Sequence, residues 1–275
     1  MSGIQAPDKE TMEACRLYVD NLIKPIHSLG KLEDIAVRLA GITGKIKPGK
    51  LNKAIVIMAG DTAVDGENKT GGKTSLTEVQ MASRGLGTVS AVARTLGAPV
   101  YLIDVGLEQN TNDIEGVLTN KVVYGTHRGN PALDQDAVSA AISIGMSVAR
   151  TLAVQGIQAV GLGNIGERSL LSALGVTAAI MKKELQENSL KDGFSLHMDD
   201  VGNMANDPVG VLSRVGSAEI AGLFGLVVQA AREKIAIVFD NAVTGAAVLA
   251  AIEVYPEVRD YVFPSAAYNE PVHQI

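Results

Sequence analysis

The stretch Ala54-Ile55-Val56-Ile57-Met58-Ala59-Gly60-Asp61-Thr62 carries the pattern that decides the fold. An uninterrupted apolar run with β-branched residues predicts a strand that is buried on both faces. The small and acidic residues that follow predict a turn at the carboxyl end of that strand. Similar apolar runs recur along the chain, at Val100–Val105, Gln158–Leu162, Ile235–Phe239 and Tyr261–Phe263.

Alanine-rich segments with helical character separate most of these runs. They lie at residues 77–97, 134–155, 167–187 and 216–232. Buried strands that alternate with helices are typical of a parallel sheet covered on both faces. The pattern therefore predicts an α/β fold with a doubly wound, mostly parallel sheet over residues 51–275. Residues 194–199 are expected to add one more strand.

The first 50 residues follow a different pattern. Residues 8–23 and 31–40 predict two helices, and in the second Leu32, Ile35, Ala36 and Leu39 recur at helical spacing. Pro25 and Gly30 interrupt regular structure between them. Residues 41–52, rich in lysine and glycine, are typical of a linker. We therefore expect a small helical subdomain and linker at 1–50.

Composition excludes several classes of protein. Lys and Arg number 24 and Asp and Glu 30, so the net charge of −6 disfavours a general nucleic-acid-binding surface. The single cysteine, Cys15, excludes an intrachain disulfide and a cysteine-based metal site. The first residues have no signal-peptide pattern, and the longest uncharged stretch, 151–166, is too short to span a bilayer. We expect a soluble cytoplasmic protein with no membrane partner.

Small and acidic residues gather where the predicted strands end. Ligands of open parallel sheets bind outside the carboxyl ends of the strands. Aspartate and glycine at such positions also cap helices and form turns, so both roles stay open for each residue. The strand ends carry Gly60-Asp61-Thr62, Asp104-Val105-Gly106, Gly161 to Glu167, Asp240-Asn241 and Ser265.

The segment Gly161-Leu162-Gly163-Asn164-Ile165-Gly166 matches G-x-G-x-x-G between a predicted strand and helix. Such a loop can bring backbone N–H groups to a phosphate, or it can be a tight turn. No strand ending in an acid lies about 20 residues later, which argues against a dinucleotide site. The glycines of Gly71-Gly72-Lys73-Thr74 do not have P-loop spacing.

The remaining motif classes are absent from the sequence. The four histidines lie far apart and have no zinc-ligand spacing, and no G-x-S-x-G motif is present. The segment Ile235–Gly245 differs from the loop of diphosphate-dependent phosphoribosyltransferases, because Asn241 stands where a second acid is usual. No metal and no cofactor is expected.

Several segments together resemble one family, the nicotinate-nucleotide:dimethylbenzimidazole phosphoribosyltransferases of cobamide assembly. Leu22 to Glu33 is similar to the family's L-x-K-P-x-x-S-L-G-x-L-E, and Asp207 to Ile220 is similar to a second family segment. Shorter similarities are Ala59-Gly60-Asp61 with Val64, Ile103 to Gly106, Asp240, and Ser265 with Glu270. The similarity runs from about residue 20 to residue 272.

The resemblance implies transfer of phosphoribosyl from nicotinate mononucleotide to an aromatic acceptor, which needs a base and stabilisation of the leaving nicotinate. It also implies an altered site. Thr62 replaces a family histidine, Asn164 stands in place of a glutamate, and Thr177–Val201 replaces a segment with a phosphate-contacting lysine. The family's catalytic glutamate belongs to an R-L-G-E-G-x-G-A segment that residues up to Ile275 do not contain.

We therefore expect no catalytic residue in the chain and an inactive isolated chain. It resembles most a truncated subunit of the heterodimeric phenol- or p-cresol-activating form, paired with a longer catalytic homologue. That partner is expected to bind most of the nicotinate mononucleotide and the acceptor. Residual pocket candidates are Asp61, Gln80, Gly163, Asn164, Gly166, Asp240 and Ser265, and interface candidates are Leu22, Leu32, Ile35 and Leu39.

Two alternatives stay open. In the first, the chain is a stand-alone nucleotide-binding or regulatory module without transferase chemistry. In the second, it is an enzyme in which Glu67 or Glu167 serves as a relocated base.

Overall fold

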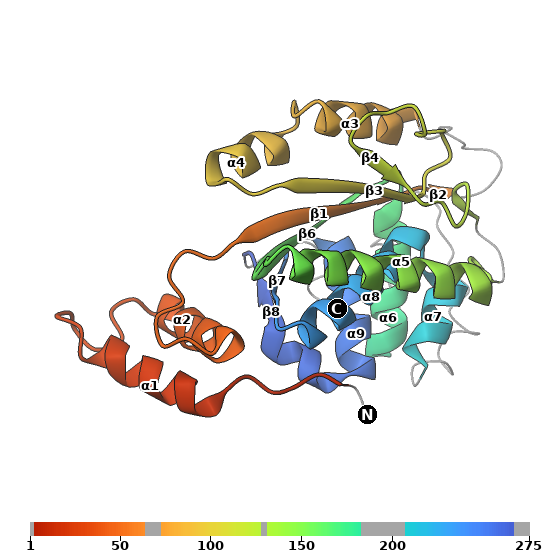
Figure 1. Ribbon diagram of the computed structural model, residues 1–275. Coiled ribbons are helices and arrows are strands. Elements are labelled where there is room, and N and C mark those ends of the chain that lie inside the picture. The colour runs from red at the N-terminus through yellow and green to blue at the C-terminus, as the bar shows by residue number, and fades with distance from the viewer. Residues whose placement is uncertain (1–2, 64–72, 128–130, 183–206, 267–275) are drawn as a thin grey trace.

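The computed structural model describes residues 3–63, 73–127, 131–182 and 207–266. Their main feature is a six-stranded sheet in which all neighbouring strands are parallel (Figure 1). This confirms the predicted α/β class. In spatial order the strands are β4 (Val117–Thr119), β3 (Val100–Gly106), β1 (Lys53–Gly60), β6 (Ala159–Ile165), β7 (Ala236–Phe239) and β8 (Val262–Pro264).

The order of the strands reverses between β1 and β6. The chain builds outward from β1 to β3 and β4 on one side, and then from β6 to β7 and β8 on the other. Open α/β sheets bind ligands at the carboxyl ends of the two central strands beside such a reversal. We call this region of the molecule, around Gly60, Asp61 and Gly166, the crevice. Ala59 pairs with Ile165, so Gly60 and Gly166 follow side by side at this point.

Helices cover both faces of the sheet (Figure 1). On one side lie α3 (Lys73–Ser83) and α4 (Thr88–Leu96). On the other side lie α5 (Gln135–Val154), α6 (Ser169–Met181), α7 (Pro208–Val215), α8 (Ala218–Arg232) and α9 (Ala242–Val254). A 3-10 helix, Pro256–Tyr261, leads into β8.

Some elements differ from the sequence-based expectation. The helix expected at 77–97 is broken into α3 and α4 by Gly85, whose φ of 72° suits glycine. The helix α9 was missed because its alanines and valines are buried nearly all round, which leaves no amphipathic period. Two-residue strands β2 (Thr62–Ala63) and β5 (Thr126–His127), which pair with each other, are too short to predict. The strand expected at 194–199 lies outside the described residues.

The long helix α5 is apolar enough to cross a membrane by length and composition. One third of an apolar 18-residue stretch of α5 is buried, and the buried side of the helix lies against α8 with Ala141, Ala149 and Leu152 in the main hydrophobic core. A Cβ on Gly145 would lie 1.9 Å from the carbonyl oxygen of Gly222, so only glycine allows this close approach. The cytoplasmic location stays a prediction.

The N-terminal residues form a helical pair, α1 (Lys9–Asp20) and α2 (Lys31–Thr43). Cys15, Val19, Val37 and Ala40 make a small core of their own between the helices. The pair lies at the amino end of the sheet, away from the crevice (Figure 1). Arg38 fastens it to the rest of the fold by donating hydrogen bonds to the carbonyl groups of Arg259, Asp260 and Val262. The division into two domains stays a prediction.

Candidate functional site

Asp61 is the centre of the crevice between β1 and β6. It is buried, and three donors from three segments reach its carboxylate. The Ser75 hydroxyl of α3 and the backbone N–H of Glu167 donate to Oδ1 at 2.5 and 2.9 Å, and the backbone N–H of Glu108 donates to Oδ2 at 3.0 Å. Hydrogen bonds to a charged acceptor are among the stronger ones in proteins. Asp61 therefore joins the segments that line the crevice.

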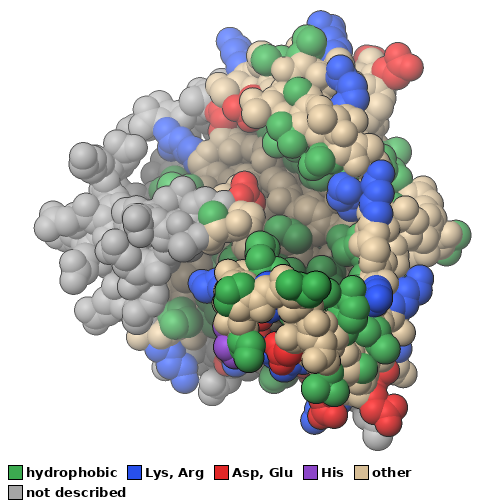
Figure 2. All heavy atoms as spheres, turned by 90° about the vertical axis from the view of Figure 1, so that its left-hand side faces the viewer, with side chains coloured by type: hydrophobic (Ala, Val, Ile, Leu, Met, Phe, Trp, Pro, Cys, Tyr) green, Lys and Arg blue, Asp and Glu red, His purple; other side chains and the backbone are tan. Residues whose placement is uncertain are grey.

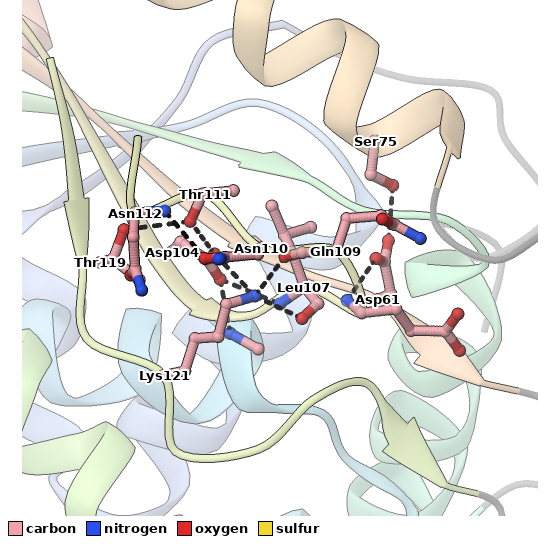
Figure 3. A network of polar contacts seen from close by, with 12 residues as sticks. Asp61, Ser75, Asp104, Leu107, Gln109, Asn110, Thr111, Asn112, Thr119 and Lys121 are labelled. Carbon is pink, nitrogen blue, oxygen red and sulfur yellow. Dashed lines mark hydrogen bonds and ion pairs between the residues drawn. The ribbon is translucent and has the colours of Figure 1, made fainter. Parts of the chain in front are cut away.

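Beside it, Asp104 organises the loop that follows β3 (Figure 3). Its Oδ1 accepts the backbone N–H groups of Gly106 and Leu107, and its Oδ2 accepts the Thr111 hydroxyl. Lys121 lies 2.9 Å from Oδ2 and also donates to the carbonyl group of Leu107. The whole cluster is buried and its charges are paired. It fixes the loop that brings the Glu108 N–H to Asp61.

The glycine-rich segment is placed differently from the expectation of a loop. Gly161 and Gly163 lie inside β6, opposite Ile55 and Ile57 of β1, and a Cβ on Gly163 would lie 3.1 Å from the Ile57 side chain. Gly163 therefore makes room for the Ile57 side chain, whereas a Cβ on Gly161 would make an ordinary contact with Ile55 at 3.6 Å. Only Gly166 lies beyond the strand, where a Cβ would meet the Gly60 carbonyl oxygen at 1.8 Å. The motif therefore packs the two central strands closely.

Three other pocket candidates meet at the ends of β6, β7 and β8. The Asn241 side chain caps α9 and donates to Asn164 Oδ1 at 2.9 Å. The Ser265 hydroxyl donates to Asp240 Oδ1 at 2.6 Å. Gln80 lies partly buried on α3, the helix that provides Ser75. The structure thus brings Asn164 near Asn241 and Asp240 near Ser265, while Asp61 belongs to a separate group of contacts.

Two further acids lie near Asp61. Glu219 was not among the predicted site residues, whereas Glu167 is one of the two acids that the sequence offers as a relocated base; the other, Glu67, lies outside the described residues. Glu219, in the first turn of α8, is fully buried, and its Oε1 accepts the Ser217 hydroxyl at 2.7 Å. Burial raises the pKa of Glu219 to about 7, and the charge of Asp61 also raises it. The Ser217 and Ser169 hydroxyls have the opposite effect and lower the pKa. Glu167 Oε1 accepts the backbone N–H of Thr74 at 2.9 Å. A buried acid within the apolar stretch 218–228 is the signal that identifies Glu219.

The interface candidates lie on the helical pair or in the turn after α1. Leu22, Leu32 and Ile35 expose 39%, 64% and 38% of their surface, and Ile23 is fully exposed. Figure 2, which looks at this end of the molecule, shows hydrophobic side chains gathered beside a hollow. Leu39 differs, because it is partly buried and packs against the main core. It is therefore not part of the exposed face.

One group in the helical pair has metal-ligand spacing. Ligand atoms of Asp20, His27 and Glu33 lie within 4.8 Å of one another. The Lys24 ammonium group, however, lies 2.9 Å from Glu33 Oε1. It lowers the pKa of Glu33, as the backbone N–H of Leu29 also does. The negative charge of this carboxylate is thus already balanced by a lysine.

Comparison with known proteins finds relatives that match nearly the whole chain. A family model described as phosphoribosyltransferase matches residues 4–275. The nicotinate-nucleotide–dimethylbenzimidazole phosphoribosyltransferase of Alkaliphilus metalliredigens is 34% identical, and the match covers 97% of this chain and 81% of that protein. The protein of the same name from Acetivibrio thermocellus is 33% identical, with 96% and 80% covered.

A solved structure gives the same result for the fold. The crystal structure of nicotinate-nucleotide–dimethylbenzimidazole phosphoribosyltransferase from Thermus thermophilus superposes with a TM-score of 0.83 at 26% identity. The superposition covers 97% of this chain and 84% of that one. The family resemblance of the sequence is thus confirmed, and this chain, with its crevice between β1 and β6, belongs to the phosphoribosyltransferase family that these proteins represent.

Proposed function

We propose that this chain takes part in moving a phosphoribosyl group from nicotinate mononucleotide to an aromatic acceptor, a phenol, p-cresol or a benzimidazole. The product would provide the lower ligand of a cobamide. The name of the relative that is 34% identical supports nicotinate mononucleotide as the donor and a benzimidazole as the acceptor, and the resemblance of the sequence to the phenol- or p-cresol-activating form adds the other two acceptors. The crevice at the strand reversal is where such a fold would receive a nucleotide.

Within this reaction, the chain acts as a non-catalytic subunit beside a longer catalytic homologue. The transfer needs a base that takes a proton from the acceptor. Both carboxylate oxygens of Asp61 accept hydrogen bonds from the protein itself, and Asp240 accepts one from Ser265. The oxygens of these carboxylates that would have to face an acceptor already receive hydrogen bonds from the protein, so Asp61 and Asp240 are better placed to hold the fold than to take a proton from the acceptor.

The observation that carries the subunit proposal is the exposed apolar face of the helical pair. Leu32 and Ile35 lie one turn apart on α2, and Ile23 precedes them in the connecting turn. Contiguous apolar surface of this kind is characteristic of protein–protein contacts. The partner that we propose for this face is a second family chain, which would also supply the base for the transfer.

The first experiment tests the reaction. The chain alone is incubated with nicotinate mononucleotide and either p-cresol or dimethylbenzimidazole, and then again with a longer homologue from the same organism. We expect no turnover by the chain alone and turnover when both are present, at a rate above that of the homologue alone. Full activity of the isolated chain would reject the non-catalytic role, and no gain over the homologue would reject the subunit role.

The second experiment tests the surface with matched substitutions. Leu32→Glu places a charge on the exposed face, and Leu170→Glu makes the same change at 50% exposure elsewhere. Both residues are second in a 13-residue helix, so the effect on the helix itself is similar. We expect Leu32→Glu to abolish co-elution with the homologue in size-exclusion chromatography and Leu170→Glu to retain it.

The alternative is a stand-alone nucleotide-binding module. The observation that supports it is the position of the crevice at the strand reversal. The module is distinguished by titration calorimetry of the isolated chain with nicotinate mononucleotide. The subunit role predicts weak or no binding, whereas a micromolar site, worth about 8 kcal/mol, would favour the module.

A further inference from the structure

The carboxyl group of Glu219 fills the space that a side chain at position 60 would need. A Cβ on Gly60 would lie 2.4 Å from Glu219 Oε2 and 3.3 Å from its Cδ. The acid of α8 therefore packs directly against the main chain at the end of β1. Asp61 is the next residue along that main chain, so Gly60 has Asp61 as its neighbour in sequence and Glu219 as its packing neighbour.

The environment of Glu219 is unusual for a charged group. Its side chain is fully buried, and Oε2 accepts no hydrogen bond of ordinary geometry. No ion pair among the described residues includes it, and Asp61 is the charged group that acts on it. An unpaired buried carboxylate is costly, and a neutral carboxyl group is much less so. Packing against Gly60 and burial together favour the protonated form.

We infer that Glu219 is a proton-controlled positioning residue of the crevice: its neutral carboxyl group supports the Gly60–Asp61 turn, and its ionisation loosens the hydrogen bonds around Asp61. When the proton leaves for solvent, a second negative charge appears beside Asp61. The two carboxylates then repel each other, and the Gly60 backbone has to move away from Oε2. Because Asp61 joins three segments, this movement reaches Ser75, Glu108 and Glu167.

The inference concerns the crevice itself and holds whether or not the chain works with a partner. It predicts that a ligand in the crevice binds more weakly when Glu219 is ionised. It also gives Glu219 no contact with substrate, since the side chain is fully buried.

The backbone amides of Glu108 and Glu167 report the hydrogen bonds directly, since both donate to Asp61. Their NMR resonances and exchange protection are followed from pH 5.5 to 8.5, with correction for intrinsic exchange. In the wild type we expect one titration with a tenfold loss of protection. In Glu219→Gln, which is neutral at every pH, we expect no titration. The Thr244 amide, bonded to Asn241, is the control and should not change.

Further variants separate other causes. Ser217→Ala removes a hydroxyl that favours the ionised form, so the midpoint should move to higher pH. Glu253→Gln, an exposed glutamate on α9, and His127→Gln, next to Thr126 whose N–H binds the Asp61 carbonyl group, should leave the titration unchanged. The inference is overturned if the titration persists in Glu219→Gln or is absent from the wild type. If Glu219→Gln does not fold, an unmoved midpoint in Ser217→Ala overturns it.

Discussion

The two ends of the sheet are built in opposite ways. At the carboxyl end, buried polar groups from β1, α3, the loop after β3 and the loop after β6 bond to one another around Asp61. At the amino end, the helical pair has a small core and an exposed face that includes Leu32 and Ile35. At the carboxyl end most of the described polar groups are paired within the chain, with Oε2 of Glu167 and of Glu219 as buried exceptions, whereas the amino end leaves apolar surface in water.

The contrast shows that a segment similar to an enzyme family does not have to lie at the site of the reaction. The segment Leu22 to Glu33, one of the clearest family matches, lies at the end of the sheet that is far from the crevice (Figure 1). Because of this distance, the segment can affect the crevice of this chain only indirectly. A second chain, packed on the helical pair, would give that segment a partner.

The largest effect is expected where the two central strands come together. Gly166→Ala would place a Cβ 1.8 Å from the Gly60 carbonyl oxygen, so the backbone must separate. We expect the free energy of unfolding to fall by about 3 kcal/mol. Gly44→Ala, at a φ of 64° in open space after α2, should cost only about 1 kcal/mol. Urea denaturation of both variants measures the difference, and equal losses would contradict a tighter carboxyl end.

Much of this arrangement could be predicted from sequence, and the reasons for the rest are physical. Apolar runs such as Ala54–Ala59 predict buried strands because they are short, rich in β-branched residues and followed by turn residues, whereas buried helices are usually longer. Their carboxyl ends then locate Asp61 and Asp240 at one edge. The predicted strand Gln158–Leu162 already contains Gly161, but β6 continues to Ile165 and so includes Gly163, which the sequence predicts in a loop because a glycine inside a strand has no local signal. The Ile57 side chain on the neighbouring strand explains Gly163, since a Cβ there would lie 3.1 Å from it.

The contacts of the site were harder to predict. Ser75, Glu108 and Glu167 reach Asp61 from segments far apart in sequence, and two of them do so through backbone N–H groups that any residue could provide. Glu219 lies in the family-like segment Asp207 to Ile220, but no role was predicted for it from the sequence. An acid in an otherwise apolar helix is nevertheless a recognisable sign of a buried polar site. Leu39 was assigned to the same exposed face as Leu32, but the main core covers it.

The second effect depends on pH and concerns Glu219. Its pKa is raised from 4.5 to about 7, so the unfolded chain ionises first and wild-type stability falls as pH rises through this window. Glu219→Gln removes this loss. The free energy of unfolding of the variant, measured relative to the wild type, should therefore be about 3 kcal/mol higher at pH 8 than at pH 4.5. Denaturant unfolding at both pH values measures it, and a difference that does not depend on pH would contradict the assignment.

A smaller effect is expected from a matched pair of aspartates, one at each end of the sheet. Asp61→Asn removes the charge that accepts three hydrogen bonds and turns one acceptor into a donor, at a cost of about 2 kcal/mol. Asp34→Asn breaks an exposed ion pair with Arg16 and should cost less than about 0.5 kcal/mol. Thermal unfolding of the two variants decides whether the carboxyl end is the more strongly bonded one.

The smallest effect concerns the helical pair and is local. Glu33 is nearly buried in α2, where it accepts hydrogen bonds from Lys24 and from the backbone N–H of Leu29. These contacts lower the pKa of Glu33, so their stabilisation is present above the unfolded pKa of 4.5 and is lost as pH falls through the folded value. Glu33→Gln should loosen the turn between α1 and α2 at neutral pH without unfolding the sheet.

Cys15 offers a direct measure of that loosening, since it is the one cysteine in the sequence and lies buried between α1 and α2. We expect Glu33→Gln to raise the rate at which a thiol reagent labels Cys15 several-fold at pH 7, because the helical pair opens more often. Asp34→Asn, one residue away but exposed, should leave the rate unchanged. At a pH low enough to protonate Glu33 in the folded wild type, wild type and Glu33→Gln should be labelled at the same rate. If the variant stays faster there, the Lys24–Glu33 pair is not what closes the amino end.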